Sequence, residues 1–286
     1  MKRLLTDKEY FSFKGLSKSQ IKKWNDNNPM AFWRNCVFNP NRVDEGVTDA
    51  LVNGRLAHTL LLEPHRFHQE YKIIPDGKGF SSRKTKAFQD AIANEKSGKD
   101  LVLESEYHNW VNRIRTLLSY DLVMDILKGI VIEKPVIWEE KGLVLKAKLD
   151  AVKNTSQGIV LIEYKTTSTI EKNVKGIDIG GYVYDVGMQC KAIEALYGQT
   201  PIKMVFIIQS SKPEEENWID IRSVEKPDIE ICRVYTDMVI EKIKKRLDKG
   251  LCDDSFKTEL KERGFEGYQD TAFSLLFDKK MSEMGE

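Results

Sequence analysis

The chain of 286 residues is 41% hydrophobic, enough to bury a substantial core in one large domain or two small ones. Its 45 Lys and Arg residues nearly cancel its 44 Asp and Glu residues, so the net charge of +1 gives no sign of a nucleic-acid partner, and any DNA contact would need a local basic surface. No segment has the apolar length of a signal peptide or a membrane span, and we expect a cytosolic protein.

Short helices are predicted near the N-terminus. Ser17 can cap one of them, with Gln20 in the capping-box position, and Asn28-Pro29 can begin the next. A stronger helix is predicted over residues 48–63, where apolar and small side chains recur with helical spacing. We expect one stripe of this helix to be buried, formed by Leu51, Gly54, His58 and Leu61.

The middle of the chain changes from helical to strand patterns. Residues 75–86 (PDGKGFSSRKTK) predict a mobile loop, because their glycines, serines and basic residues follow no apolar period. Helices are predicted to begin near Ala87 and to cover residues 104–127. Strands then follow at 131–139, 143–153 and 158–166, with the spacing of an antiparallel meander.

A helix over 182–197, strands over 203–209 and 218–224, and a helix over 229–249 complete the pattern. A meander followed by a crossover helix and another strand predicts an α/β fold, a mixed β-sheet flanked by helices. We expect one domain over residues 1–249 with a helical N-terminal elaboration. Residues 250–286 form a separate segment, either a docking tail or a final packed helix. The four cysteines include no CxxC pair and are expected to be free thiols: Cys36, Cys190, Cys232 and Cys252.

Charged residues lie at the ends of two neighbouring predicted strands. Alternation in LVLKAKLDAV places Asp150 on the face opposite the apolar residues Leu143, Leu145, Ala147, Leu149 and Ala151. In the next strand, Glu163 and Lys165 follow an apolar run that indicates burial on both faces. Buried charge is costly unless it is paired or bound to metal, so two carboxylates and a backbone carbonyl here predict a Mg²⁺ site. The lysine could then orient a metal-bound water for attack on phosphorus.

Each residue has a simpler interpretation when it is taken alone. An ExK sequence in a strand is commonly a solvated ion pair, and a lone histidine on an apolar helical stripe is commonly a core residue. The set is more specific than its parts, because Asp150, the ExK strand, two threonines after it and a helix carrying Gln189 follow one another in order.

The segments GRLAHTLLLEP, KLDAV, LIEYKTT and YDVGMQCKA resemble, in this order, the PD-(D/E)xK nuclease superfamily. Within it they look like the RecE-like (exonuclease VIII-like) phage exonucleases, which are distantly related to lambda exonuclease. The resemblance covers residues 16–247 and implies a restriction-endonuclease-like core. It implies that Asp150 and Glu163 are metal ligands, that Lys165 is the catalytic lysine and that His58 lies beside the metals. Gln189 corresponds to a glutamine of the following helix, although Ile193 stands where relatives often have tyrosine.

The resemblance also implies residues that bind DNA. The loop GFSSRKTK is similar to a basic segment of the family, where Arg83 and Lys86 would face phosphates; a solvated loop is an equal alternative. The segment LSKSQIKKW resembles the place where related exonucleases recognise a terminal 5′-phosphate, which makes Ser19, Lys22 and Arg34 candidates.

The function that the resemblance implies is 5′-to-3′ degradation of double-stranded DNA with Mg²⁺ or Mn²⁺, two ions per site. The product would be a 3′ single strand for a RecT-like annealing protein. The resemblance also implies that the enzyme forms a homo-oligomeric ring, and that it acts in the bacterial cytoplasm if a phage or prophage encodes it. Some such nucleases carry an iron-sulfur cluster, but the late cysteines here lie too far apart in the sequence. The alternatives are an endonuclease with the same site and a catalytically silent DNA-binding or assembly module. A sugar- or nucleotide-processing enzyme is a weaker alternative, because no GxxxxGKS motif is present.

Overall fold

The computed structural model describes residues 7–25, 29–42, 48–171, 182–212, 215 and 218–248. Its centre is a five-stranded sheet in the order β3-β4-β5-β6-β7. The strands β3 to β5 form an antiparallel meander, β5 pairs with β6 in parallel, and β7 returns antiparallel to β6. The predicted mixed sheet with flanking helices is confirmed. The sheet elements are β3 (Val131–Glu140), β4 (Leu143–Thr155), β5 (Gly158–Thr167), β6 (Lys203–Ser210) and β7 (Ile219–Glu225).

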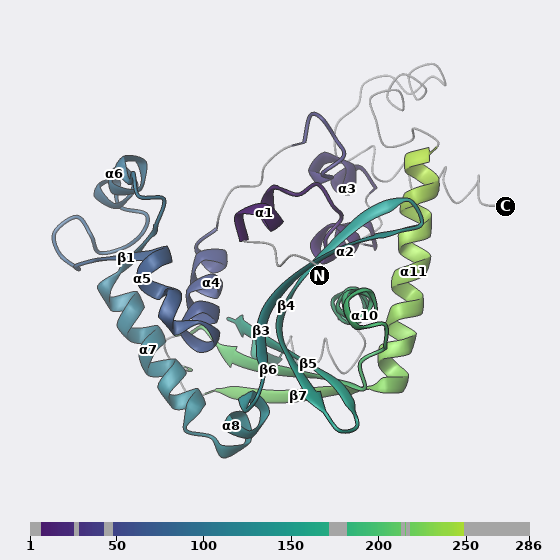
Figure 1. Cartoon of the computed structure of the whole chain (residues 1–286). Coiled ribbons are helices and arrows are strands. Elements are labelled where there is room, and N and C mark those ends of the chain that lie inside the picture. Colours follow the sequence, from purple (N-terminus) through teal and green to yellow (C-terminus); the bar gives the residue numbers. More distant parts are fainter. Residues whose placement is uncertain are drawn as a thin grey trace.

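Helices cover both faces of this sheet (Figure 1). One face packs against α10 (Val183–Tyr197) and α11 (Lys226–Asp248), as the predicted crossover and final helices require. The other face packs against α4 (Asp49–Leu62), α7 (Glu104–Leu118) and α8 (Asp121–Leu127). A single helix over 104–127 was expected. The helix is interrupted at Ser119 and Tyr120, because serine and aspartate compete for backbone hydrogen bonds and favour helix ends.

A smaller unit projects from the α4–α7 side and was not predicted. Its two parallel strands, β1 (Tyr71–Ile74) and β2 (Asp100–Leu103), are each only four residues long. They follow η1 (Pro64–Arg66) and α5 (Phe67–Glu70), and α6 (Lys86–Asn94) packs on them through the buried side chain of Phe88. The expected irregular loop before α6 is present.

The N-terminal helices are α1 (Asp7–Ser12), α2 (Lys18–Asn25) and α3 (Pro29–Asn35). They are tied to the sheet where β4 extends beyond its partner β5. Leu16 forms a parallel bridge with Leu145, donating its N–H to the Val144 carbonyl at 2.8 Å and accepting from the Lys146 N–H at 2.8 Å. Half of the expected capping box is formed, since the Gln20 side chain accepts from the Ser17 N–H at 3.3 Å. The free edge of β4 therefore positions the start of α2 over the sheet.

The regular alternation expected for β4 is interrupted at Asp150. Ala147 and Leu149 pack on the α10 face, as expected, but Ala151 packs on the α4 face. The β3–β4 hairpin curves strongly (Figure 1), and pairing between β4 and β5 stops at Ala151 and Ile162. The expectation that Ala151 shares the face of Leu149 is wrong because the strand bends where it leaves β5. This bend gives the Asp150 side chain room between the two strands.

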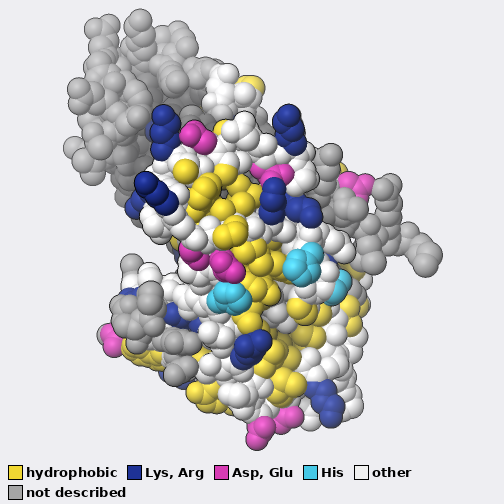
Figure 2. Space-filling model, turned by 90° about the vertical axis from the view of Figure 1, so that its left-hand side faces the viewer, with side chains coloured by type: hydrophobic (Ala, Val, Ile, Leu, Met, Phe, Trp, Pro, Cys, Tyr) yellow, Lys and Arg dark blue, Asp and Glu magenta, His cyan; other side chains and the backbone are white. Residues whose placement is uncertain are grey.

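The described part of the chain has no helix that is long and apolar enough to cross a membrane. Cys36, Cys190 and Cys232 are buried free thiols. The face viewed in Figure 2 carries Lys and Arg side chains scattered among acidic and apolar ones, without a continuous basic surface among its described residues. Asn28, Cys252 and the C-terminal segment 250–286 lie outside the described residues.

Candidate active site

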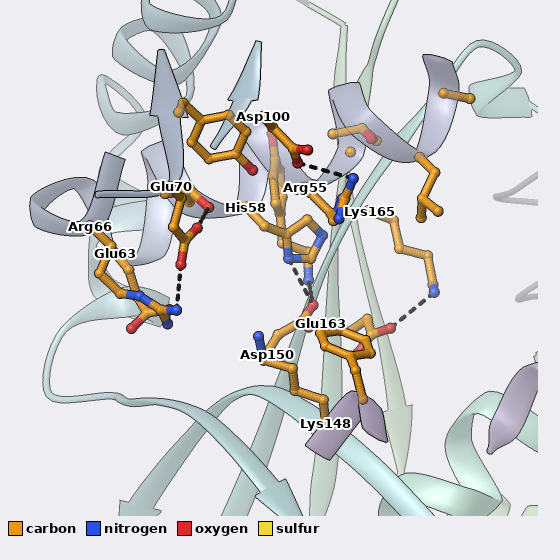
Figure 3. A pocket seen from close by; sticks show the side chains of 18 of the residues that line it. Arg55, His58, Glu63, Arg66, Glu70, Asp100, Lys148, Asp150, Glu163 and Lys165 are labelled. Carbon is orange, nitrogen blue, oxygen red and sulfur yellow. Dashed lines mark hydrogen bonds and ion pairs between the residues drawn. The ribbon is translucent and has the colours of Figure 1, made fainter. Parts of the chain in front are cut away.

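A cleft of about 810 Å³ opens where β4 and β5 separate. Its walls come from α2, α4, α5 and the start of α10, and its floor carries the middle of β4 and the C-terminal half of β5. The predicted residues Asp150, Glu163, Lys165 and His58 all line it, as does Lys22. Residues from separate elements thus converge on one space (Figure 3).

Glu163 is the most enclosed carboxylate of the cleft, with 3% of its side chain exposed. Its Oε1 accepts from Lys165 Nζ at 3.0 Å and from Lys18 Nζ at 2.7 Å, and its Oε2 accepts from the Gln189 amide. Burial alone would raise the pKa of Glu163, but Lys18 and Lys165 overcome this effect and hold that pKa below its usual value. Glu163 is therefore an ionised acceptor surrounded by donors.

Asp150 lies in a different environment on the other side of the strand gap. Its Oδ2 accepts the Tyr164 N–H at 3.0 Å, which replaces the strand pairing that ends at Ala151. The same oxygen is 3.6 Å from His58 Nδ1, and the His58 ring lies 5.0 Å from the Tyr164 ring. Burial and then the Glu163 charge raise the pKa of Asp150 well above its ordinary value. Lys18 and Lys165 offset this rise in pKa only in part, so a further cation beside Asp150 would stabilise its ionised form.

Two lysines share two acids on the α10 side of the cleft. Lys165 Nζ is 3.3 Å and Lys18 Nζ 3.6 Å from Asp185 Oδ1, in the first turn of α10. Burial alone would lower the pKa of Lys165, but Glu163 and Asp185 raise it above its usual value. The Tyr182 ring lies 5.1 Å from the Lys165 ammonium and completes its surroundings. Lys165 is held as a cation and is unsuited to act as a base.

Gln189 contacts Glu163 from the buried side of the site, on α10. Its side chain is fully buried, and its amide nitrogen donates to Glu163. Its Oε1 has no hydrogen-bond partner among the described residues. The prediction that Gln189 belongs to this site agrees with its position, and its contact with Glu163 identifies it as a residue that positions the carboxylate.

Two residues of this cluster were missed by sequence reasoning. Asp185 is four residues before Gln189 on α10, and this helical spacing was a usable signal. Lys18 had no such signal, because it reaches Glu163 only through the long-range bridge between Leu16 and Leu145. A tertiary contact made by the backbone, rather than a sequence motif, places the second lysine.

Three of the four residues of the stripe expected to be buried on α4 line the cleft instead. Leu51, Gly54 and His58 line the cleft, and 51% of Leu51 is exposed. Leu61, the fourth residue of the expected stripe, is buried as predicted, and Leu56, outside the stripe, also faces the core. A Cβ on Gly54 would lie 3.6 Å from Thr166 Oγ1, an ordinary van der Waals distance, so α4 passes next to the end of β5. The stripe is a cleft wall, and His58 faces Asp150 rather than the core.

Apart from Lys22, the candidate DNA contacts lie outside the cleft. Arg83 is 7% exposed and forms a two-pronged ion pair with Glu106, with both N···O distances 2.9 Å. This pair fixes the loop to α7, so the expectation that the Arg83 guanidinium faces phosphates is not met in this conformation. Lys86, Ser19 and Arg34 are exposed and do not line the cleft. Their contact with DNA stays a prediction.

Among the described residues, no three His, Cys, Asp or Glu side chains form an assembled metal site. The donor set nevertheless fits a hard divalent cation, because Asp150 and Glu163 present two carboxylates to one cleft. The orphaned buried oxygen of Gln189 marks another unfilled acceptor near Glu163. Asp150, Glu163 and His58 are the residues that would hold such an ion.

Comparisons with known proteins identify the fold. No protein-family model and no curated protein match the chain. A crystal structure of a "putative exonuclease" from Eubacterium rectale superposes with a TM-score of 0.57, at 14% sequence identity, over 87% of this chain and 88% of that one. The crystal structure of SSO0001 covers 48% of this chain and 67% of its own at 18% identity, but its TM-score of 0.27 is too low to support an argument. At these identities the likeness establishes a shared mixed α/β fold.

Proposed function

We propose that this chain is a metal-dependent DNA exonuclease of the PD-(D/E)xK type. The observation that carries the proposal is the meeting of Asp150, Glu163 and Lys165 in one cleft at the point where two strands separate. Their order in the sequence and their shared position in one cleft support the roles that the resemblance implies. The fold shared with the Eubacterium rectale protein supports the same conclusion.

The residues of the cleft divide the work of phosphodiester hydrolysis. Asp150 and Glu163 would hold divalent metal, which when bound supplies a Lewis acid and lowers the pKa of water. Lys165, kept protonated by Glu163 and Asp185, directs its ammonium at the place where negative charge develops on the phosphorane oxygens. Gln189 fixes the Glu163 carboxylate from the buried side. His58 restrains Asp150 from the α4 wall.

The direction and biological role form the finer part of the proposal. We propose 5′-to-3′ degradation of double-stranded DNA, which leaves a 3′ single strand for a RecT-like annealing protein. A homo-oligomeric ring would enclose the duplex and multiply the few cations of each subunit around one channel. The molar mass in solution, measured by light scattering, tests the ring independently of the chemistry.

The deciding experiment is digestion of a linear duplex carrying a label at its 5′ end. Reactions with Mg²⁺, Mn²⁺ or EDTA are compared for 5′-phosphate and 5′-hydroxyl ends, with closed-circular DNA as the topological control and Lys165→Ala as the protein control. We expect metal-dependent release of labelled mononucleotide from the linear DNA alone. Cleavage of the circle would identify an endonuclease, and absence of hydrolysis with either metal would identify a silent binding module.

A further inference from the structure

A second pocket, of about 360 Å³, adjoins the cleft on the other side of α4. Ala50 and Thr166 line both spaces, so a chain bound across the end of β5 can reach from one into the other. We name this space the amide pocket after Asn53 and Asn109, which line it from α4 and α7. Hydroxyl groups from Thr166, Thr167, Ser168 and Ser211 complete its polar lining.

The orientation of both amides is fixed by buried donors. The Trp110 indole N–H donates to Asn53 Oδ1 at 3.3 Å, and Arg113 Nε donates to Asn109 Oδ1 at 2.8 Å. An indole N–H and a guanidinium can only donate, so the atom that each asparagine turns toward them must be its oxygen. The amide nitrogens of Asn53 and Asn109 are therefore left as the donors of the pocket.

A chain of buried hydrogen bonds makes this orientation rigid and connects it to the catalytic strand. The Tyr164 hydroxyl donates to Gln209 at 2.6 Å, and Gln209 Nε2 donates to the Arg113 carbonyl at 2.9 Å. The fully buried Arg113 guanidinium also donates to the carbonyls of Ser210 and Lys212, at 2.7 and 2.6 Å. The Asn109 donor is thus preorganised on the framework that includes Tyr164, the residue between Glu163 and Lys165, whereas Asn53 is oriented by Trp110 alone.

The charge of the pocket selects the kind of ligand. No Lys or Arg is among its described lining residues, and its single acid, Glu106, is already paired with Arg83. A phosphate buried there would lack a counter-charge, whereas neutral carbonyl oxygens and ring nitrogens match amide donors. Nucleobases carry such acceptors on their edges.

We propose that the amide pocket binds the base of a nucleotide that flanks the phosphate being cleaved, through the amide N–H groups of Asn53 and Asn109. This inference rests on the proposed function, because it takes the bound polymer to be DNA with its scissile phosphate in the adjoining cleft. It adds a site at which the protein contacts a base edge, beside the cleft proposed to hold the scissile phosphate.

The test replaces the donors without removing the acceptors. Asn53→Asp and Asn109→Asp keep the oxygens that Trp110 and Arg113 require and convert each N–H₂ into a carboxylate oxygen. Asn154→Asp, at an exposed position of β4, adds the same charge elsewhere and serves as the matched control. Binding of short duplexes is measured by fluorescence anisotropy with Ca²⁺ in place of Mg²⁺, so that affinity is read without cleavage.

Each protein is compared on an intact duplex and on duplexes carrying an abasic residue at the terminal or the penultimate nucleotide. We expect wild-type protein and Asn154→Asp to bind intact DNA about 3- to 10-fold more tightly than one abasic duplex, and the two pocket variants to lose this preference. General repulsion by the added charge would weaken the binding of the intact and the abasic duplexes equally, and would leave the ratio of their affinities unchanged. An unchanged ratio in the pocket variants, or no preference in the wild type, overturns the inference, whereas DNA binding without Mg²⁺-dependent cleavage overturns only the proposed function.

Discussion

Lys165 and Lys18 occupy similar positions beside Glu163, but they reach it by different routes and should differ in effect. Lys165→Ala removes the ammonium that is nearer to Asp185 and 3.0 Å from Glu163, while Lys18, at 2.7 Å, remains to neutralise the buried Glu163 carboxylate. We expect a loss of about 10²- to 10³-fold in the single-turnover cleavage rate, with DNA affinity and Tm close to wild type. Near-wild-type cleavage by this variant would remove the mechanistic basis of the proposal.

The Lys18 ammonium competes with any metal cation for the Glu163 carboxylate. Its Nζ lies 2.7 Å from Glu163 Oε1, yet 35% of its side chain is exposed, so it can move away. Lys18→Met removes the charge and keeps the aliphatic stem, and we expect about fivefold tighter binding of Mn²⁺, the ratio that corresponds to a partly exposed ion pair of about 1 kcal/mol. Lys18→Arg is the matched control and should keep the wild-type affinity. The Kd for Mn²⁺ of each protein is measured by isothermal titration calorimetry. Unchanged or weaker Mn²⁺ binding by Lys18→Met would contradict the competition between Lys18 and the metal.

The described cysteines should behave as inert thiols. Burial raises the pKa of Cys36 to about 11, that of Cys190 to about 12 and that of Cys232 to about 11. Because a raised pKa keeps the thiol protonated below that value, little of the reactive thiolate forms at pH 8. We expect iodoacetamide to leave these three residues unmodified in the native protein and to modify all of them in denaturant, as measured by peptide mass spectrometry. Rapid native modification of any of them would contradict their burial.

At the scale of elements, the contact between α10 and α11 holds half of the site in place. A Cβ on Gly187 would lie 2.0 Å from Thr236 Oγ1 and 2.5 Å from the Cys232 carbonyl, so the two helices approach each other only through glycine. Gly187→Ala increases the helix propensity of α10, but the added methyl group clashes with the Cys232 backbone carbonyl, which cannot rotate away. We expect the clash to outweigh the gain and to lower the free energy of unfolding by about 1–3 kcal/mol.

Thermal unfolding followed by circular dichroism checks this prediction. We expect Gly187→Ala to lower Tm by roughly 3 to 8 °C. Gly77→Ala is the control, because a Cβ there has no neighbour within 4 Å and its φ is not positive. Since α10 also carries Asp185 and Gln189, Gly187→Ala should slow cleavage as well, and a Tm equal to that of the control would show that the helices can separate without cost.

The elements that were predicted correctly are those whose pattern is local. The three meander strands, the crossover helix and the pairing of Glu163 with Lys165 follow from alternation and apolar runs within each segment. The short strands β1 and β2 offered too few residues for a period to be seen. The α4 stripe misled for another reason: a cleft wall and a core face can both be apolar, and only the position of Asp150 across from His58 distinguishes them.

At the scale of the whole molecule, the cleft has no surplus of positive charge. It is lined by six basic residues, Lys18, Lys22, Arg55, Arg66, Lys148 and Lys165, and by six acidic ones, Glu63, Glu70, Asp100, Asp150, Glu163 and Asp185. Arg55 is paired with Asp100, and Arg66 with Glu63 and Glu70, so several of these cations are already neutralised (Figure 3). The net charge of the chain, +1, adds no long-range attraction for DNA.

Affinity for DNA should therefore depend on divalent metal before any chemistry occurs. A divalent metal ion held by Asp150 and Glu163 would raise the net charge of the cleft by two, at the position of the scissile phosphate. We expect a short duplex to bind at least tenfold more tightly in Ca²⁺ than in EDTA at the same ionic strength, by fluorescence anisotropy. Asp150→Asn should lose most of this difference, while Asp100→Asn, whose carboxylate pairs with Arg55 at the far wall, should keep it. Equal affinity of the wild type in Ca²⁺ and EDTA would mean that DNA is held by basic residues outside the cleft, with Lys86 and Arg34 the first to be replaced.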